Sequence, residues 1–442
     1  MSYKFPDSSS RHKKNRAVEN VLVLQGGGSL GAFACGVFKA LVKEHIKIDV
    51  VAGTSIGAIN AAIIAGSKSS QPEVDLENFW MELAESSHKI IPNYLTFFYD
   101  FQKKAMNLRN NPSASANAAV FGVPKMFLPR WNPVYMFSDK DYFAPQNWTY
   151  YYDNTPLVKT LEKYIDYEKL ISPHKKINKE KNKGSDDNKF TTSSNSTNYI
   201  RLVITAVNVL TAEPLVFDSD HLSIVSKHLL ASCGYPNYGF PWVEIEKGVY
   251  GWDGSLLSNT PVREVISSSP RNDKNIFIVE NYSRKIDRLP ANMTEVLDRA
   301  KDIMFSDKTQ HSLKMAKVMT RQIQLIERLY EYFEKLEDKT ILQDVDIGEK
   351  TNDKSNDYTY TQNEIEKIRK EYKNLVQNRG AEILSVTRIV RNRVENPNVS
   401  KNADFSVKTI KKMISEGEIT TLQQIKEFKE NNEYNCRSHL YR

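Results

Sequence analysis

Ser55 lies in a G-T-S-I-G segment, between Gly53 and Gly57. An apolar run at residues 48–52 precedes this segment, and a second apolar run at residues 58–66 follows it. A serine nucleophile must stand on a sharp turn between a strand and a helix, where its hydroxyl is exposed, and glycines flank it because Cβ atoms there would clash. The pattern therefore predicts that Ser55 is a nucleophile, against the alternative of an ordinary turn built of small residues.

A second glycine-rich segment, G-G-G-S-L-G at residues 26–31, follows the apolar run 21–24. Such a loop presents several backbone N–H groups at one point, which suits an anion such as the oxyanion of acyl transfer. The segment also fits dinucleotide binding, which requires an acidic residue at the end of the second strand. The acid in that region, Asp49, lies at the start of the expected strand, and the serine turn occupies its end. The sequence thus favours an oxyanion loop.

Asp253 follows a short apolar stretch and precedes Gly254. An Asp-Gly pair alone most often marks a turn, but near a nucleophilic serine the carboxylate is a candidate base if burial raises its basicity. The chain has eight histidines, and none lies in a loop after a late strand, where a Ser-His-Asp triad needs its base. These positions favour a Ser–Asp dyad over a triad.

In this order, the three motifs resemble those of the patatin-like phospholipase family, over about residues 20–282. The resemblance implies that Ser55 is the nucleophile and that Asp253 is the general base and later the general acid. It implies that the N–H groups of the 26–28 loop form the oxyanion hole. The residues of the three motifs that support this assignment are Gly26, Gly27, Gly28, Gly31, Gly53, Gly57 and Gly254. Residues 151–157 and 206–209 resemble a microbial subgroup whose C-terminal helical region has no assigned role.

Two positions depart from the family pattern. Leu30 stands where many relatives carry a basic residue, which removes the basis for a charge contact there but leaves the oxyanion geometry unaffected. Ser255 stands where the family carries glycine or alanine. A serine would be strained at that position if the backbone requires a positive φ, and activity would then be reduced.

The order of apolar runs predicts the fold class. Strand-helix-strand-helix order over residues 21–66 predicts a parallel sheet with right-handed crossovers. Residues 199–210, 214–217 and 276–279 have the pattern of further strands, and the chain after residue 292 is mostly helical by period. With the resemblance, we expect an α/β three-layer fold with a central, mostly parallel sheet and a C-terminal helical region.

Composition shifts suggest boundaries along the chain. We expect a disordered tail at residues 1–19, a catalytic domain at 20–290 and a helical region at 291–442. Within the catalytic domain, residues 92–147 are rich in aromatic residues, proline and asparagine, which indicates either a lid-like insertion or a packed surface insertion. The polar tract 175–198 is expected to be a flexible loop.

Charge and cysteine content exclude several classes of protein. The net charge of +7 is mild for 442 residues, and no nucleic-acid-binding motif accompanies it. Three widely spaced cysteines form neither a disulfide framework nor a zinc pattern, so we expect no metal and no cofactor. No signal peptide or membrane-spanning run is found, and we expect a cytoplasmic protein with peripheral membrane contact as an alternative. The oligomeric state is not predicted.

The predicted function is hydrolysis of carboxylic esters of lipids or phospholipids through an acyl-enzyme. A transacylase would use the same site with another acceptor alcohol. A weakly active or inactive scaffold that binds lipid or a partner is the alternative from another class, on the basis of Ser255, the aromatic insertion and basic residues in the C-terminal helices. Phospholipid, neutral glyceride and thioester all remain open as substrates.

Overall fold

The computed structural model describes residues 3–4, 17–88, 113–173, 199–267, 272–344, 362–377, 382–392 and 400–438. The expected flexible loop at 175–198 lies outside these ranges, as do residues 92–112 of the expected lid-like insertion. Most of the expected disordered tail also lies outside them. Tyr3–Lys4 of that tail forms strand β1, and strand β2 already begins at Val18.

A nine-stranded sheet organises the protein, in the order β1-β11-β10-β2-β3-β6-β9-β8, with β7 also paired to β6. Five neighbouring strands are parallel: β11 (Ile383–Val390), β10 (Asp273–Glu280), β2 (Val18–Leu24), β3 (Val50–Thr54) and β6 (Arg201–Asn208). The remaining strands pair antiparallel: β1, β7 (Pro214–Asp218), β8 (Val243–Glu246) and β9 (Val249–Asp253). The prediction of a central, mostly parallel sheet is confirmed.

Helices cover both faces of the sheet. Alternate side chains of a strand point to these opposite faces and enter two separate apolar clusters. In β2, Leu22 and Leu24 belong to one apolar cluster, whereas Val21 and Val23 belong to another. The larger cluster is covered by α1 (Ala32–Lys43), α2 (Ile56–Gly66), α3 (Pro72–His88) and α13 (Val407–Ser438). The smaller one is covered by α9 (Val262–Ser267) and the start of α11 (Gln310–Asp344). The result is the expected three-layer arrangement.

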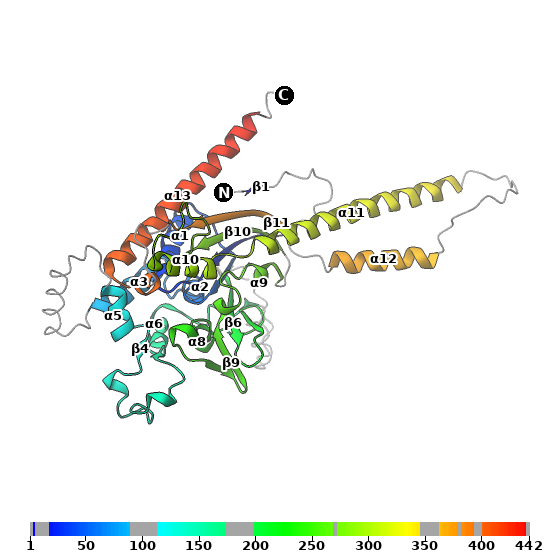
Figure 1. Ribbon diagram of the computed structural model, residues 1–442. Coiled ribbons are helices and arrows are strands. Elements are labelled where there is room, and N and C mark those ends of the chain that lie inside the picture. The colour runs from blue at the N-terminus through cyan, green and yellow to red at the C-terminus, as the bar shows by residue number, and fades with distance from the viewer. Residues whose placement is uncertain are drawn as a thin grey trace, which may run out of the picture.

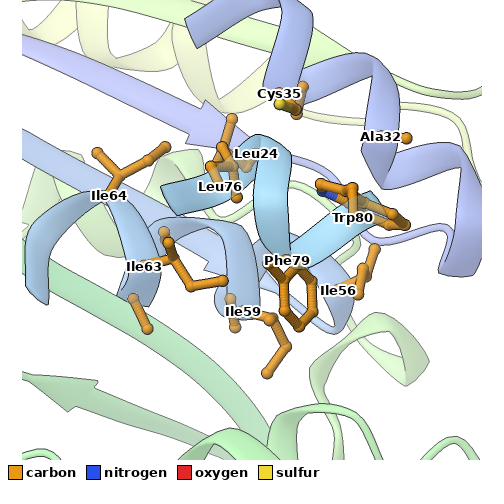
Figure 2. Packing of buried hydrophobic residues seen from close by; sticks show 14 of the residues in the cluster. Leu24, Ala32, Cys35, Ile56, Ile59, Ile63, Ile64, Leu76, Phe79 and Trp80 are labelled. Carbon is orange, nitrogen blue, oxygen red and sulfur yellow. The ribbon is translucent and has the colours of Figure 1, made fainter. Parts of the chain in front are cut away.

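Helix α2 is apolar apart from Asn60, and it is enclosed on all sides. All of its residues are buried. Figure 2 shows Phe79 and Trp80 of α3 beside Ile56 and Ile59 of α2. This packing fixes the N-terminus of α2, where the expected nucleophile lies.

The C-terminal part of the chain contains α10 (Met293–Phe305), α11, α12 (Gln362–Gln377) and α13, as the helical period predicts. Helices α11 and α13 extend beyond the rest of the molecule (Figure 1). The backbone of α13 lies against that of α1, since a Cβ added at Gly36 would be 1.8 Å from the Ile414 oxygen. Strand β11 was not predicted, and it places the C-terminal part inside the main sheet. The domain division at residue 290 stays a prediction.

The remaining short elements lie between these strands and helices. They are η1 (Gly28–Gly31), α5 (Ser113–Phe121), β4 (Leu128–Pro129), η2 (Pro133–Tyr135), η3 (Pro145–Asn147), β5 (Tyr152–Asp153), α6 (Pro156–Tyr164), α8 (Ser226–Ser232), η4 (Pro236–Tyr238), η5 (Gly254–Leu256) and η6 (Lys401–Ala403). Among the described helices, none has both the length and the apolar character that crossing a bilayer requires.

Candidate active site

Ser55 stands between the end of β3 and the start of α2, as the sequence predicts. Its φ of 57° and ψ of −130° are strained for a residue with a side chain, at a typical cost of about 1–3 kcal/mol. The flanking glycines allow this turn: a Cβ at Gly53 would be 2.2 Å from the Gly57 oxygen, and a Cβ at Gly57 would be 2.3 Å from the Leu24 oxygen. The turn therefore depends on close backbone packing that only glycine permits.

A buried serine on α8 anchors the nucleophile's backbone. The N–H of Ser55 donates to Ser232 Oγ at 2.9 Å, and Ser232 Oγ donates to the Thr205 carbonyl oxygen at 2.8 Å. Ser232 thereby ties the serine turn to β6. The sequence assigns Ser232 no role, because nothing in its local pattern marks its contact with Ser55.

Asp253 ends strand β9, whose pairing with β6 sets Asp253 opposite Ala206. The side chain is buried. Its Oδ1 accepts from the Ser255 N–H at 2.8 Å and from Ser255 Oγ at 2.7 Å. Its Oδ2 is buried without a hydrogen-bond partner among the described residues. One carboxylate oxygen is thus held in place and the other is open to accept a proton.

The surroundings of Asp253 raise its basicity. Burial raises the pKa of the Asp253 carboxyl to about 6. The Ser55 hydroxyl, which lies near the carboxyl without a hydrogen bond of good geometry to Oδ2, and the two Ser255 donors lower the pKa by less. Ser255 is absent from the described residues with positive φ, so the expected strain at this position does not occur. Its hydroxyl instead adds a hydrogen bond that glycine or alanine could not supply.

The glycine loop passes beside the nucleophile. A Cβ at Gly26 would lie 2.9 Å from Ser55 Cβ, so only glycine fits there. Gly27 and Gly28 have φ of 155° and 57°, and both line the cavity that contains Ser55. Gly31, at the end of the glycine segment, packs against Ile56, since a Cβ added at Gly31 would lie 2.9 Å from the Ile56 side chain.

Residues far along the chain support the glycine loop. Asn281 Nδ2 donates to the carbonyl oxygens of Gln25 at 3.1 Å and Gly26 at 3.2 Å. Arg391 Nε in turn donates to the backbone carbonyl oxygen of Asn281 at 3.0 Å. A Cβ on Gly28 would be only 2.3 Å from the Asn402 carbonyl oxygen. The C-terminal part of the protein therefore contributes directly to the shape of this loop.

Lys401 fixes that C-terminal contribution. Its carbonyl oxygen accepts from Ser29 Oγ at 3.1 Å, within the glycine loop segment. Its buried ammonium pairs with Asp298 at 2.9 Å and with Asp302 at 2.5 Å, both on α10. Since a buried cation requires such partners, this triad locks η6 between the loop and α10.

A cavity of about 460 Å³ contains Ser55, Gly27, Gly28 and Asp253. One group of its lining residues is mainly apolar: Ala118, Ala119, Met126, Phe127, Tyr152, Leu157 and Phe240. Another group is more polar: Asn237, Tyr238, Lys301, Ser400 and Asn402. Among the described lining residues, the acidic and basic side chains are Asp253 and Lys301. The site thus offers an amphiphilic molecule both kinds of surface.

The described lining offers neither a histidine base nor a readily ionised thiol. It contains no histidine, and His228 packs on Phe217 with its Nδ1 accepting from the Val225 N–H at 3.0 Å. Cys233 lines the cavity, but burial and the nearby Asp253 raise the pKa of its thiol well above the usual value. No cluster of three possible metal ligands occurs within the described ranges.

The fold and the site define an α/β protein with a strained serine at a strand-helix turn and a buried carboxylate nearby. A family model described as Patatin-like phospholipase matches residues 22–266, more than half of the chain. The chain belongs to the patatin-like phospholipase family. Lipid acyl hydrolysis is the general activity that this membership supports.

Relatives match over short segments. Lysophospholipase nte1 of Aspergillus terreus is 54% identical over 44 residues, which is 10% of this chain and 3% of that protein. Triacylglycerol lipase SDP1L of Arabidopsis thaliana is 34% identical over 74 residues, 17% of this chain and 9% of that protein. The chain thus spans a small fraction of either relative. The crystal structure of VipD from Legionella pneumophila aligns with a TM-score of 0.36 and 16% identity, over 95% of this chain and 69% of that one.

Proposed function

We propose that this protein hydrolyses carboxylic esters of lipids, with Ser55 as nucleophile and Asp253 as general base and acid. The observation that carries the proposal is the juxtaposition in one cavity of a strained serine and a buried carboxylate whose Oδ2 has no partner among the described residues. A pKa of about 6 leaves Asp253 ionised at neutral pH yet more basic than an exposed carboxylate.

In the first half of the reaction, Ser55 Oγ attacks the ester carbonyl carbon while its proton passes to Asp253 Oδ2. The carbonyl electron pair moves to the oxygen, and the resulting oxyanion lies against the N–H groups of the glycine loop. Collapse of this intermediate breaks the ester bond. The leaving alcohol takes the proton from Asp253, and the acyl group stays on Ser55.

In the second half, a water molecule gives its proton to Asp253 as its oxygen attacks the acyl-enzyme. Collapse releases the fatty acid and returns the proton to Ser55 Oγ. An acceptor alcohol in place of water would give transacylation by the same steps. The strain argument for an inactive scaffold no longer applies, because Ser255 lacks a positive φ and donates to the carboxylate.

The lining suggests which lipids fit. Apolar residues such as Phe127 and Phe240 suit an acyl chain, whereas Lys301 offers positive charge to an anionic headgroup. Position 30, where many relatives carry a basic residue, is a leucine that is only 2% exposed. The cation of this cavity therefore comes from α10, and we propose phosphate-bearing lipid esters as preferred substrates.

The test is hydrolysis of a medium-chain p-nitrophenyl ester by the wild type, Ser55→Ala and Asp253→Asn, with Ser267→Ala on the exposed side of α9 as control. We expect both site variants to lose turnover while circular dichroism stays unchanged. Wild-type activity should rise with pH and level off above about 6, because Asp253 acts in its ionised form. Activity that survives in Ser55→Ala would refute the mechanism.

A further inference from the structure

Helix α10 has its polarity reversed relative to an ordinary surface helix. Its buried side carries three acids, Glu295, Asp298 and Asp302. Its apolar side chains are instead largely exposed, and we refer to five of them as the α10 apolar face: Met293 (68%), Val296 (42%), Leu297 (52%), Ile303 (53%) and Met304 (54%). A surface helix of a globular protein normally turns such residues toward the core.

The buried acids fix this orientation. Glu295 pairs with Arg288 at 2.7 Å and accepts from the Ala291 N–H at 3.0 Å. Asp298 and Asp302 pair with the buried ammonium of Lys401. Turning the helix over would leave these charges without partners, which is strongly unfavourable in a protein interior. The apolar face is therefore held toward solvent by these ion pairs, and those of Lys401 also support the glycine loop.

The α10 apolar face adjoins residues that line the cavity of the candidate active site. Lys301 and Phe305 of the same helix line the cavity. Tyr235, another lining residue, donates its hydroxyl to the sulfur of Met304 at 3.8 Å. The apolar surface and the site are consequently continuous through α10.

The exposed charges that flank this face in the chain are mainly basic. Lys285, Lys308 and Lys314 are exposed, and the exposed acid among them is Asp287; Arg288, also exposed, is paired with Glu295. Asp307, an acid in the same stretch, is buried and pairs with Arg284 at 2.9 Å. Leu289, 85% exposed, extends the apolar surface on the N-terminal side of the helix. Apolar side chains beside cations match the chemistry of an anionic lipid surface.

We propose that the α10 apolar face docks the protein onto an anionic lipid surface and so brings the cavity to its substrate. This inference rests on the proposed function for its benefit to the protein, since a lipid ester must pass from an aggregate into the cavity. The charge complementarity and the continuity with the site favour a lipid surface as the occupant over a protein partner or a second copy of the chain.

The test measures flotation of the Ser55→Ala protein with phosphatidylcholine vesicles that either contain or lack phosphatidylserine. Using the Ser55→Ala background keeps binding separate from catalysis, so failure of the hydrolase proposal would leave this readout intact. We expect a Met293→Gln/Leu297→Gln variant to bind about tenfold or more weakly, because two apolar side chains no longer enter the lipid. Phe137→Gln is the matched control, since Phe137 is 96% exposed and lies on another segment.

A second variant separates charge from apolar contact. Lys308→Glu/Lys314→Glu should weaken binding to vesicles with phosphatidylserine and leave binding to pure phosphatidylcholine vesicles nearly unchanged. When the catalytic Ser55 is kept, both double variants should retain wild-type turnover of a soluble short-chain ester but lose activity on vesicles.

Wild-type flotation by the Met293→Gln/Leu297→Gln variant would overturn the proposal. So would a loss confined to self-association in ultracentrifugation without any change in vesicle binding, because the face would then join two copies of the chain. Equal weakening by Phe137→Gln would also overturn it, since the effect would not belong to α10.

Discussion

The serine turn and the glycine loop lie side by side in one cavity, yet the protein holds them in different ways. The serine turn is fixed by its own glycines and by Ser232, which links it to the neighbouring strand β6. The glycine loop is fixed by residues far along the chain, among them Asn281, Lys401 and Asn402. The nucleophile thus depends on local packing, whereas the loop that faces it depends on the C-terminal part.

This difference has a consequence for stability and activity. Lesions at the C-terminal support should damage the oxyanion loop as much as lesions in the loop itself. Lesions near the serine turn should act mainly through the position of one hydroxyl.

Lys401→Met should have the largest effect. It leaves Asp298 and Asp302 buried without their cation, and breaking a buried ion pair typically costs about 3–5 kcal/mol. We expect a matching loss in the free energy of unfolding by urea, with reduced turnover at temperatures where the variant stays folded. Lys408→Met, at an exposed lysine on α13, is the control and should have little effect. Equal free energies of unfolding for the two variants would mean that the Lys401 ion pairs do not provide the C-terminal support of the glycine loop.

Gly28→Ala should come next. The added Cβ would meet the Asn402 carbonyl oxygen at 2.3 Å, at a φ of +57°. We expect the loop to shift and kcat to fall by about 10²–10³, the usual consequence of losing one oxyanion donor. The control is Gly248→Ala, where φ is +82° but no atom lies within 4 Å of the new Cβ. Because the control shares the backbone strain, a larger loss at position 28 would assign the effect to the contact with Asn402.

Ser232→Ala should have a moderate effect. It removes two hydrogen bonds, to the Ser55 N–H and to the Thr205 oxygen, and we expect the free energy of unfolding to fall by about 1–3 kcal/mol. We expect kcat to fall by about tenfold while KM stays nearly constant, since only the position of the nucleophile changes. A loss in kcat greater than that of Gly28→Ala would reverse the contrast between the two regions.

The sequence could predict what is encoded locally. The glycine-flanked Ser55 and the apolar runs before and after it define β3, α2 and the turn between them, and the parallel sheet follows from the order of the runs. The roles of Ser55 and Asp253 stay predictions, although the structure brings both into one cavity.

The rest depends on partners that are distant in sequence. Lys401 has no distinguishing neighbours, and its acids lie about a hundred residues earlier, so nothing local marks it as buried. The run at 383–390 is rich in β-branched residues, a signal for β11 that the helical period around it obscured. Helical period alone would turn the apolar side of α10 inward, because the buried ion pairs that reverse it are invisible in the pattern.

The smallest effect is expected for Ser255→Ala, which converts the site to the residue that many family members carry. The variant removes the Oγ donor to Asp253 Oδ1 and keeps the backbone N–H donor. Since hydrogen bonds to the carboxylate favour its charged form, their loss should raise the pKa of Asp253 further above its present value of about 6. The acidic limb of kcat/KM should therefore move to higher pH, with turnover at pH 8 nearly unchanged because Asp253 is ionised there in both proteins. A limb that stays in place would mean that the Ser255 hydroxyl does not tune the base, and a lower plateau at high pH would mean that it positions the carboxylate instead.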